Sequence, residues 1–196
     1  RLVLATLNSV ALSPPESFYD RYPHELSGGQ RQRVVIARSI VVEPEFVVAD
    51  EPVAMVDVSV RAQLMDVLAK LKIKGNLTYL FITHDLASAK YLCDRIAIMY
   101  AGKIAEIGKT QDIFADPQHP YTRALLSSIP VPDPKNIVEK MIVGGEVPSL
   151  VHPPSGCRFH PRCPYSEKLC NAEEPNLEKI GEKHYVSCIP KPFLKR

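Results

Sequence analysis

Several features that would place a protein in a class at once are missing from this 196-residue sequence. No apolar run approaches the roughly 20 residues that a membrane-spanning helix needs. Polar residues interrupt the apolar start, residues 2–12, which we expect to form an amphipathic helix with Val3, Leu7, Val10 and Ala11 on one face. A protein of this kind that works at a membrane must therefore dock onto another subunit.

Three further absences concern charge and motifs. The net charge of +2 is nearly balanced, so composition gives no support for nucleic-acid binding. The chain has no internal repeat and no low-complexity tract, and no G-x-x-x-x-G-K-[ST] phosphate loop occurs anywhere in it. By itself, the sequence lacks the loop with which many nucleotide-hydrolysing proteins cradle phosphate.

The distribution of proline divides the chain. An apolar fraction of 45% and a charged fraction of 23% are ordinary for a globular protein, and the length suits one or two domains. Five prolines precede residue 110 and thirteen follow it, and four of the five cysteines follow residue 150. We therefore expect an α/β region to about Gly108 and then a loop-rich extension.

The sequence Leu-Ser-Gly-Gly-Gln at residues 26–30 introduces a segment without Gly or Pro that suits a helix, residues 30–42. Ser27 is a natural N-cap residue, and Gly28 and Gly29 would let an anion approach the backbone N–H groups at a helix start. These residues alone would favour an ordinary capped helix. The carboxylates described next favour a phosphate-binding helix start instead.

Two carboxylates follow a short apolar run. Residues 46–49, Phe-Val-Val-Ala, suit a buried parallel strand, and Asp50 and Glu51 come at its carboxyl end, where open α/β sheets bind ligands. One carboxylate can hold Mg²⁺ through water, and the other can orient or deprotonate a water molecule. The alternative is that Asp50, Glu51 and the following proline form a simple turn that ends the strand and bind no ligand.

His84 follows a second expected strand, residues 78–83. A lone histidine is more often structural than catalytic, but this one lies at a strand end, as Asp50 does, and could reach the same ligand. Residues 95–100 and 103–107 predict a hairpin, and Cys93, isolated among apolar residues, is expected in the core.

Four cysteines form a block near the C-terminus: Cys157, Cys163, Cys170 and Cys188. The gaps between them are five, six and seventeen residues. We expect metal ligands rather than disulfides, with a [4Fe-4S] cluster or Zn²⁺ as occupant, and note that the C-x₂-C pairs of zinc ribbons are absent. Three nearby histidines could replace a thiolate, although we expect each to be a solvated loop residue: His152, His160 and His184.

The first 108 residues resemble the ATPase domain of ABC transporters. Residues 26–30 match that family's signature motif, residues 46–51 match its Walker B strand and catalytic glutamate, Asp57 matches the D-loop aspartate, and His84 matches the switch histidine. The resemblance implies an incomplete ABC-type P-loop NTPase core of the α/β class. It also implies a helical subdomain piece and, after the core, a small irregular Cys-rich extension.

Site roles follow from the resemblance. In that family two ATPase domains enclose two ATP molecules head to tail. Ser27, Gly28, Gly29 and Gln30 would therefore bind the γ-phosphate held by the partner subunit.

The strand-end residues receive separate roles from the resemblance. Asp50 would hold Mg²⁺ through water, Glu51 would polarise the attacking water, and His84 would sense the γ-phosphate. Asp57 would take part in contacts to nucleotide across the dimer.

Two departures qualify this resemblance. The family's phosphate loop lies upstream of its signature motif, so Arg1 looks like an internal start, and this stretch should not hydrolyse ATP alone. Val53 and Ala54 stand where the family usually has hydroxyl residues, which alters the contacts expected around Asp57.

The C-terminal part, residues 109–196, resembles one branch of the family. Residues 119–126, His-Pro-Tyr-Thr-Arg-Ala-Leu-Leu, and the cysteine block look like the extension of oligopeptide/dipeptide importer ATPases, a branch associated with an iron–sulfur cluster. The resemblance implies ATP-driven uptake of peptides, or of nickel or sugars in relatives. It implies a second ATPase subunit, permeases and an extracytoplasmic solute-binding protein as partners, no nucleic acid, and a position at the cytoplasmic face of the membrane.

Two alternatives remain open from the sequence. One is a soluble ABC ATPase of DNA repair or translation, although no coiled-coil insert or second ATPase half is visible. The other is a fragment that binds a partner and a metal but hydrolyses nothing, which the missing phosphate loop makes plausible.

Overall fold

The chain forms two compact units in a computed structural model that describes residues 1–54, 56–129, 141, 144–146 and 148–193. The N-terminal unit is residues 1–92 and the C-terminal unit is residues 93–196. The division precedes the domain boundary expected near residue 108, because the hairpin before that position pairs with a strand near the C-terminus. Within the described residues, no helix is both long and apolar enough to cross a membrane.

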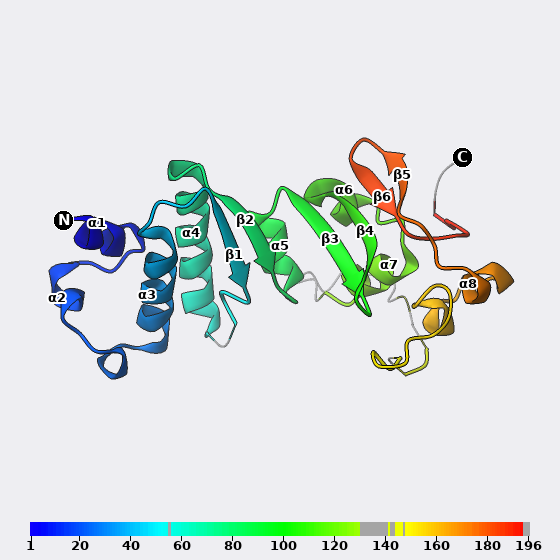
Figure 1. The fold of residues 1–196 in the computed structure, drawn as a ribbon, viewed down its shortest axis with the longest axis horizontal. Helices are drawn as coiled ribbons and strands as arrows, with labels where there is room; N and C mark the ends of the chain where they lie inside the picture. Colours follow the sequence, from blue (N-terminus) through cyan, green and yellow to red (C-terminus); the bar gives the residue numbers. More distant parts are fainter. Residues whose placement is uncertain (55, 130–140, 142–143, 147, 194–196) are drawn as a thin grey trace, which may run out of the picture. The chain divides into compact units, whose positions relative to one another are not determined.

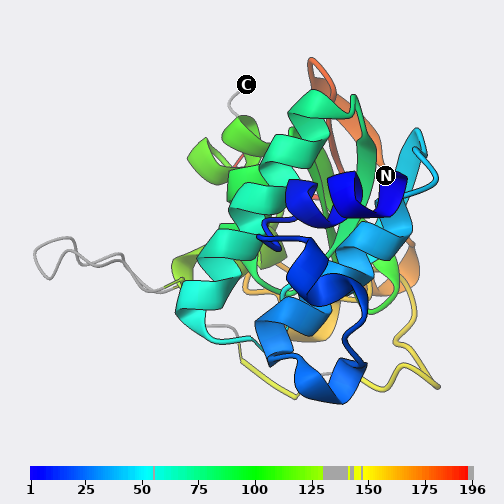
Figure 2. The same cartoon turned by 90° about the vertical axis from the view of Figure 1, so that its left-hand side faces the viewer.

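The N-terminal unit combines helices with a two-stranded parallel sheet (Figure 1). Its elements are α1 (Leu2–Ser9), α2 (Glu16–Tyr19), η1 (Pro23–Glu25), α3 (Gly28–Ile40), β1 (Phe46–Asp50), α4 (Val58–Lys74), β2 (Thr78–Ile82) and α5 (Leu86–Leu92). Helix α1 packs on α3, and α3 packs on α4 (Figure 2). The helix expected at residues 30–42 is confirmed as α3, and the two expected strands are confirmed as β1 and β2.

The expected apolar face of the first helix is only partly correct. Leu7 and Val10 are buried, but Val3 is 45% exposed and Ala11 is exposed. The helix ends at Ser9, and Ala11 has a φ of 58°. This left-handed turn redirects the chain, so that Leu12 is buried instead.

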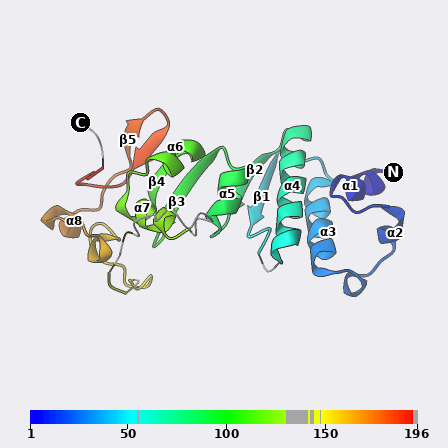
Figure 3. The ribbon, with the colours of Figure 1, turned by 180° about the vertical axis from the view of Figure 1, so that it is seen from behind.

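The expectation that both strands are buried is wrong for half of their side chains. Only Ala49 of β1 is fully buried, whereas Phe46, Val48, Leu80 and Ile82 are 55, 56, 49 and 45% exposed. All four lie on one face, because side chains alternate along a strand. The two-stranded sheet is covered more on its other face, and α4 lies alongside β1 (Figures 1 and 3).

The C-terminal unit is built on a four-stranded sheet in the order β3-β4-β6-β5. Its elements are β3 (Arg95–Tyr100), β4 (Lys103–Lys109), α6 (Thr110–Ala115), α7 (Pro120–Ser127), η2 (His160–Arg162), α8 (Lys168–Ala172), β5 (Glu178–Gly181) and β6 (His184–Val186). The predicted hairpin is confirmed: β3 and β4 pair antiparallel, and the turn residues Ala101 and Gly102 have φ values of 47° and 80°. Two positive φ values in a two-residue loop are typical of a type I′ turn.

A buried carboxylate holds this unit together. Glu106 in β4 is 0% exposed and accepts hydrogen bonds from the backbone N–H groups of Gln118 (2.8 Å) and His119 (2.9 Å). His184 Nε2 lies 2.7 Å from Glu106 Oε1. The expectation that His184 is a solvated loop residue is therefore wrong: it is a strand residue with 12% side-chain exposure that satisfies a buried carboxylate.

Replacing Glu106 should destabilise this unit strongly. Glu106→Gln removes a buried charge that three donors share, and breaking such a pair costs about 3 kcal/mol of unfolding free energy. Urea unfolding, with hydrogen exchange of β4 and β6 amides, measures the loss. Glu178→Gln is the matched control, because its ion pair with Lys191 is 57% exposed at the carboxylate and should contribute less than about 1 kcal/mol. Equal small effects for both variants would contradict this account.

Candidate functional site

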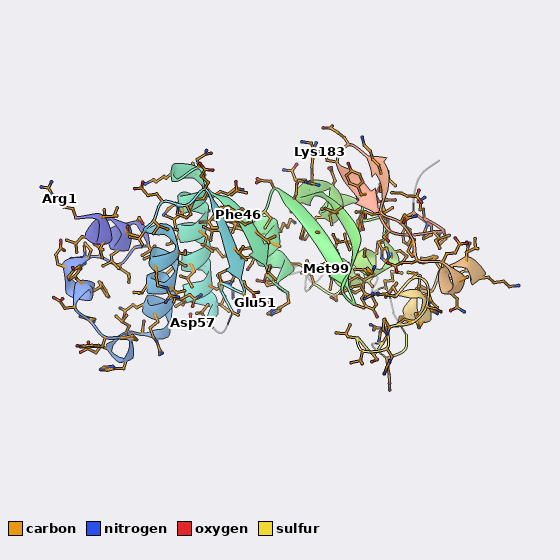
Figure 4. The ribbon with its side chains drawn as sticks, in the orientation of Figure 1. Arg1, Phe46, Glu51, Asp57, Met99 and Lys183 are labelled. Carbon is orange, nitrogen blue, oxygen red and sulfur yellow. The ribbon has the colours of Figure 1, made fainter. Side chains whose placement is uncertain are left out.

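Parallel pairing of β1 and β2 builds one group of candidate residues. Asp50 pairs with Ile82, and the Glu51 N–H continues the ladder by donating to the Ile82 carbonyl oxygen at 2.9 Å. Glu51 Oε1 then lies 2.7 Å from Nδ1 of His84. The structure therefore brings together Glu51 and His84, which are 33 residues apart, beside Asp50 (Figure 4 labels Glu51 at this end of β1 and Phe46 at the other).

Glu51 has an unusual backbone conformation. Its φ of 46° lies in the left-handed region, which non-glycine residues rarely adopt. Such conformations cost free energy and tend to occur at functional sites. Here the turn aims the carboxylate at His84 instead of continuing the strand.

The strand end can bind and orient polar ligands. The side chain of His84 is 81% exposed and that of Glu51 is 38% exposed, so both can meet a ligand from solvent. When Nδ1 carries the ring proton it donates to Glu51, and Nε2 is then an outward-facing acceptor. Asp50 is exposed, and its carboxylate pairs with no other described side chain, which leaves it available to a hydrated cation.

Asp85, the residue after His84, caps the start of α5. Its carboxylate accepts from the Ala87 N–H (3.0 Å) and the Ser88 hydroxyl (2.5 Å), and it lies 3.7 Å from Arg61. Burial alone would raise the pKa of Asp85, but these hydrogen bonds outweigh it and the pKa is lowered. An Asp with Ser three residues later, directly after a strand, predicts a helix start at this position, and α5 confirms it.

Asp57 acts in this structure as the N-cap of α4. Its Oδ1 accepts from the Val60 N–H at 2.9 Å and from the Ser59 hydroxyl at 2.8 Å, and these bonds lower its pKa. The preceding segment is only partly described, because Met55 lies outside the described residues. Gln32 Nε2 donates to the Pro52 carbonyl at 2.6 Å and so ties α3 to this segment.

A capping box begins α3. Ser27 Oγ accepts from the Gln30 N–H at 3.3 Å, and Gln30 Oε1 accepts from the Ser27 N–H at 3.0 Å. The predicted N-cap is confirmed, and the partnership with Gln30 explains why a glutamine ends the Ser-Gly-Gly-Gln run. The first N–H groups of a helix have no partner inside it, so those of Gly28 and Gly29 can bind an anion.

The two glycines of α3 have different surroundings. A Cβ at Gly28 would meet nothing within 4 Å, so this face is open to an approaching ligand. A Cβ at Gly29 would lie 2.6 Å from Cγ1 of Val60 in α4. Gly29 is therefore a packing residue between two helices, whereas Gly28 faces free space.

The four late cysteines form a second group, within the C-terminal unit. All four line one cavity of about 10 Å³, with Phe159 and Pro190 in its wall. Cys170 and Cys188 are 5 and 6% exposed, and Cys157 and Cys163 are half-buried. Cys93 is not among them. It is half-buried rather than in the core as expected, because it lies where the C-terminal unit begins.

Phe159 and Gly156 fix the first cysteine loop. Phe159 is 2% exposed and packs edge-on against Tyr100, with ring centroids 5.1 Å apart. Gly156 has a φ of 64°, and a Cβ there would lie 2.4 Å from the Cys170 carbonyl oxygen. That close approach lets the Cys157 N–H donate to the same oxygen at 2.8 Å, which joins two of the cysteine loops.

The surroundings of the thiols have opposing effects. Burial raises the pKa of Cys157 and of Cys163, and it raises the pKa of Cys188 to about 12. Hydrogen bonds from nearby backbone N–H groups act in the opposite direction on all three thiols but do not outweigh burial. The Glu167 N–H also lies 3.5 Å from Sγ of Cys170. Such donors favour thiolates, the form that binds metals. In the described part of the chain, however, no three His, Cys, Asp or Glu side chains are arranged to hold a metal ion.

The nearby histidines have other partners or face solvent. His160 is half-buried in η2, not a solvated loop residue as expected, and its Nδ1 lies 2.9 Å from the Cys157 carbonyl oxygen. His184 pairs with Glu106, and His152 is exposed. None of the three lies in a ligating position with the thiols.

Family models match both units. The model "ABC transporter" matches residues 3–54, and the model "Oligopeptide/dipeptide transporter, C-terminal region" matches residues 105–170. A Brucella ovis protein whose name refers to peptide import is 50% identical over 176 residues, covering 90% of this chain and 55% of that protein. The oligopeptide transport ATP-binding protein AppF of Bacillus subtilis is 45% identical over 184 residues, covering 93% of this chain and 55% of AppF. Residues 3–54 are thus similar to the ABC transporter family, residues 105–170 are similar to the C-terminal region of its oligopeptide/dipeptide transporters, and the relatives named here are ATP-binding proteins of such transporters.

A solved structure supports the same family fold. An ATP-binding cassette of an ABC transporter, MJ1267 in its ADP conformation, is 31% identical, with a TM-score of 0.53 over 61% of this chain and 47% of that chain. The α/β cassette fold expected from the sequence is thus confirmed. The match covers 47% of the solved cassette, so this chain contains only part of the ATPase core. The chain spans about half the length of the curated relatives it matches.

Gly28 and Gly29 of α3 should respond differently to the same substitution. Gly29→Ala forces a Cβ against the stiff side chain of Val60 and should cost about 1–3 kcal/mol of unfolding free energy. Gly28→Ala, its matched control, should change stability by less than about 0.5 kcal/mol. Urea unfolding of the N-terminal unit distinguishes the two. Equal losses would show that the α3–α4 contact does not depend on Gly29.

Stability of the C-terminal unit should fall in mild acid. Burial lowers the pKa of His119 from 6.5 to about 4, so between these values the unfolded chain binds a proton that the folded chain does not. Unfolding free energy should therefore drop by about 2 kcal/mol from pH 7 to pH 5. In His119→Asn, which keeps an acceptor for the Tyr121 N–H, this component should disappear. An unchanged pH dependence in that variant would contradict the assignment.

Proposed function

We propose that this sequence, as part of a longer protein, is the ATP-binding and ATP-hydrolysing subunit of an ABC importer for oligopeptides or dipeptides. The observation that carries the proposal is the contact of 2.7 Å between Glu51 and His84 at the end of β1, directly beside Asp50. The match to the transporter C-terminal region over residues 105–170 favours this reading over a soluble ABC ATPase.

Each strand-end residue has one task in the proposed reaction. Asp50, exposed and without a described side-chain partner, holds Mg²⁺ through water, which neutralises phosphate charge. Glu51 accepts a hydrogen bond from the attacking water and polarises it. His84, oriented by Glu51 through Nδ1, would donate to the γ-phosphate from Nε2 when both ring nitrogens carry protons.

The start of α3 serves a nucleotide bound mainly by another subunit. Ser27, Gly28 and the α3 dipole offer donors to a γ-phosphate, and the open space at Gly28 lets the phosphate approach. The chain contains no phosphate loop of its own, so we propose that it does not hydrolyse ATP alone. We propose a second ATPase subunit as partner, because two ATPase domains enclose the nucleotides head to tail in the family that this sequence resembles.

Transport needs partners outside the ATPase pair. A Haemophilus influenzae relative, 45% identical over 187 residues, is named a dipeptide transport ATP-binding protein, DppF. By this similarity we propose permease subunits and an extracytoplasmic solute-binding protein as partners, peptides as cargo, and a peripheral position on the cytoplasmic face of the membrane. No observation favours nucleic acid as a partner.

The four late cysteines are proposed as a metal site: Cys157, Cys163, Cys170 and Cys188. Support comes from their shared cavity and from the Glu167 N–H, which lies 3.5 Å from Cys170 Sγ. The family resemblance favours a [4Fe-4S] cluster, which four thiolates can hold. All four thiols line one cavity of about 10 Å³, but no three described side chains are arranged to hold a metal ion, so either occupant requires the thiols to move into ligating positions.

Glu51→Gln tests the hydrolytic role. In the full-length protein assembled in its transporter, this change should lower ATP hydrolysis by at least about 100-fold, because the amide cannot polarise water as the carboxylate does. ATP binding should persist. The control is Glu45→Gln, an exposed carboxylate just before the other end of β1, which should leave the hydrolysis rate unchanged. Hydrolysis near the wild-type rate in the Glu51 variant would refute the role.

Metal analysis tests the cysteine site. Protein purified without oxygen should contain about four irons and four sulfides per chain if the cluster is correct, or about one zinc if a single ion is bound. Cys163→Ser should lose the metal, whereas Cys93→Ser should retain it, because Cys93 lies outside the cavity. If protein purified without oxygen contains no iron and no zinc, the metal site is disproved.

A further inference from the structure

The side chain of His84 has few contacts of its own to hold it in place. It is 81% exposed, and the one described side chain with which it forms a hydrogen bond is Glu51, through Nδ1. The direction of an exposed side chain with a single partner depends on the backbone that carries it. The position of His84 therefore depends on how firmly the loop between β2 and α5 is held.

The residues on either side of His84 fix this loop. Thr83 Oγ1 accepts a hydrogen bond from the Asp85 N–H at 3.0 Å, which closes a turn around His84. The Asp85 carboxylate accepts from the Ala87 N–H at 3.0 Å and from the Ser88 hydroxyl at 2.5 Å, which ties the loop to the start of α5. Asp85 is thus the residue that anchors the backbone of His84 to a helix.

Arg61 reaches Asp85 from α4. Its Nη1 lies 3.7 Å from Asp85 Oδ2, and the two side chains are 38 and 27% exposed, so the pair is partly shielded from water. Within the described part of the chain, Asp85 is the only carboxylate at ion-pair distance from Arg61, and the buried Nε of Arg61 has no hydrogen-bond partner there. No described group therefore competes with Asp85 for this guanidinium.

We propose that Arg61 is a positioning residue for ATP hydrolysis and that it acts on His84 through Asp85. The ion pair holds the Asp85 carboxylate at the start of α5, and the loop that Asp85 anchors then keeps His84 beside Glu51. In this role Arg61 needs no contact with ATP, so its loss should lower the catalytic rate with little effect on ATP binding. The inference rests on the proposed ATPase function and adds to it a residue that lies outside the strand ends.

The kinetic test uses the full-length protein assembled in its transporter. Arg61→Gln, which keeps a polar side chain but removes the charge, should lower kcat for ATP hydrolysis about 10-fold and change KM by less than about two-fold. Arg61→Lys restores the charge and should recover most of the rate. The matched control is Tyr91→Phe, because the Tyr91 hydroxyl also links α5 to α4, by donating to Asp66 at 2.7 Å, but lies near the other end of α5. This variant should keep the wild-type kcat.

The ¹⁵N NMR signals of the His84 imidazole in the full-length subunit provide a second readout, which a general role of Arg61 in helix packing would not move. Arg61→Gln should weaken the hydrogen bond between Nδ1 and Glu51, whereas Tyr91→Phe should leave the His84 signals unchanged.

The inference is overturned if Arg61→Gln keeps the wild-type kcat or the wild-type His84 signals, or if Tyr91→Phe loses as much activity as Arg61→Gln. Glu51→Gln shows which claim has failed. If Glu51→Gln is inactive while Arg61→Gln is fully active, only the role of Arg61 is wrong. If both variants hydrolyse ATP at the wild-type rate, the proposed hydrolytic site is wrong as well.

Discussion

The parallel pairing of β1 with β2 is the constraint on which the proposed ATPase site depends. The ladder runs from Phe46–Thr78 to Asp50–Ile82, and the Glu51 N–H extends it by one more hydrogen bond. A shift of one residue would move every side chain to the opposite face. The register therefore decides that Glu51 meets His84 while Asp50 stays free, so one carboxylate can act on water and the other on a hydrated cation.

The C-terminal unit depends on burial of polar groups instead. Glu106 is fully buried and joins β4, the start of α7 and β6, which bring together residues far apart in the sequence. Phe159 anchors the cysteine loop on the same core. Packing alone therefore places the four late cysteines around one cavity.

Local patterns in the sequence were sufficient to predict much of this. Ser27 as N-cap, the strand before Asp50, and the hairpin turn at Ala101 depend on neighbouring residues only. Burial of the strands, the roles of Gly29 and His184, and the convergence of Glu51 with His84 depend on which elements pack together. Phe46 and Val48 show the limit: an apolar run predicts a strand, but only the presence of a covering element makes it buried.

The contact between Glu51 and His84 is the central claim, and ¹⁵N NMR of the His84 imidazole tests it most directly. The account predicts a proton on Nδ1 that is hydrogen-bonded to Glu51, and a loss of this hydrogen bond in Glu51→Ala, which removes the acceptor. A ring without a proton on Nδ1, or a spectrum unchanged by that substitution, would contradict the contact and with it the proposed arrangement of the site.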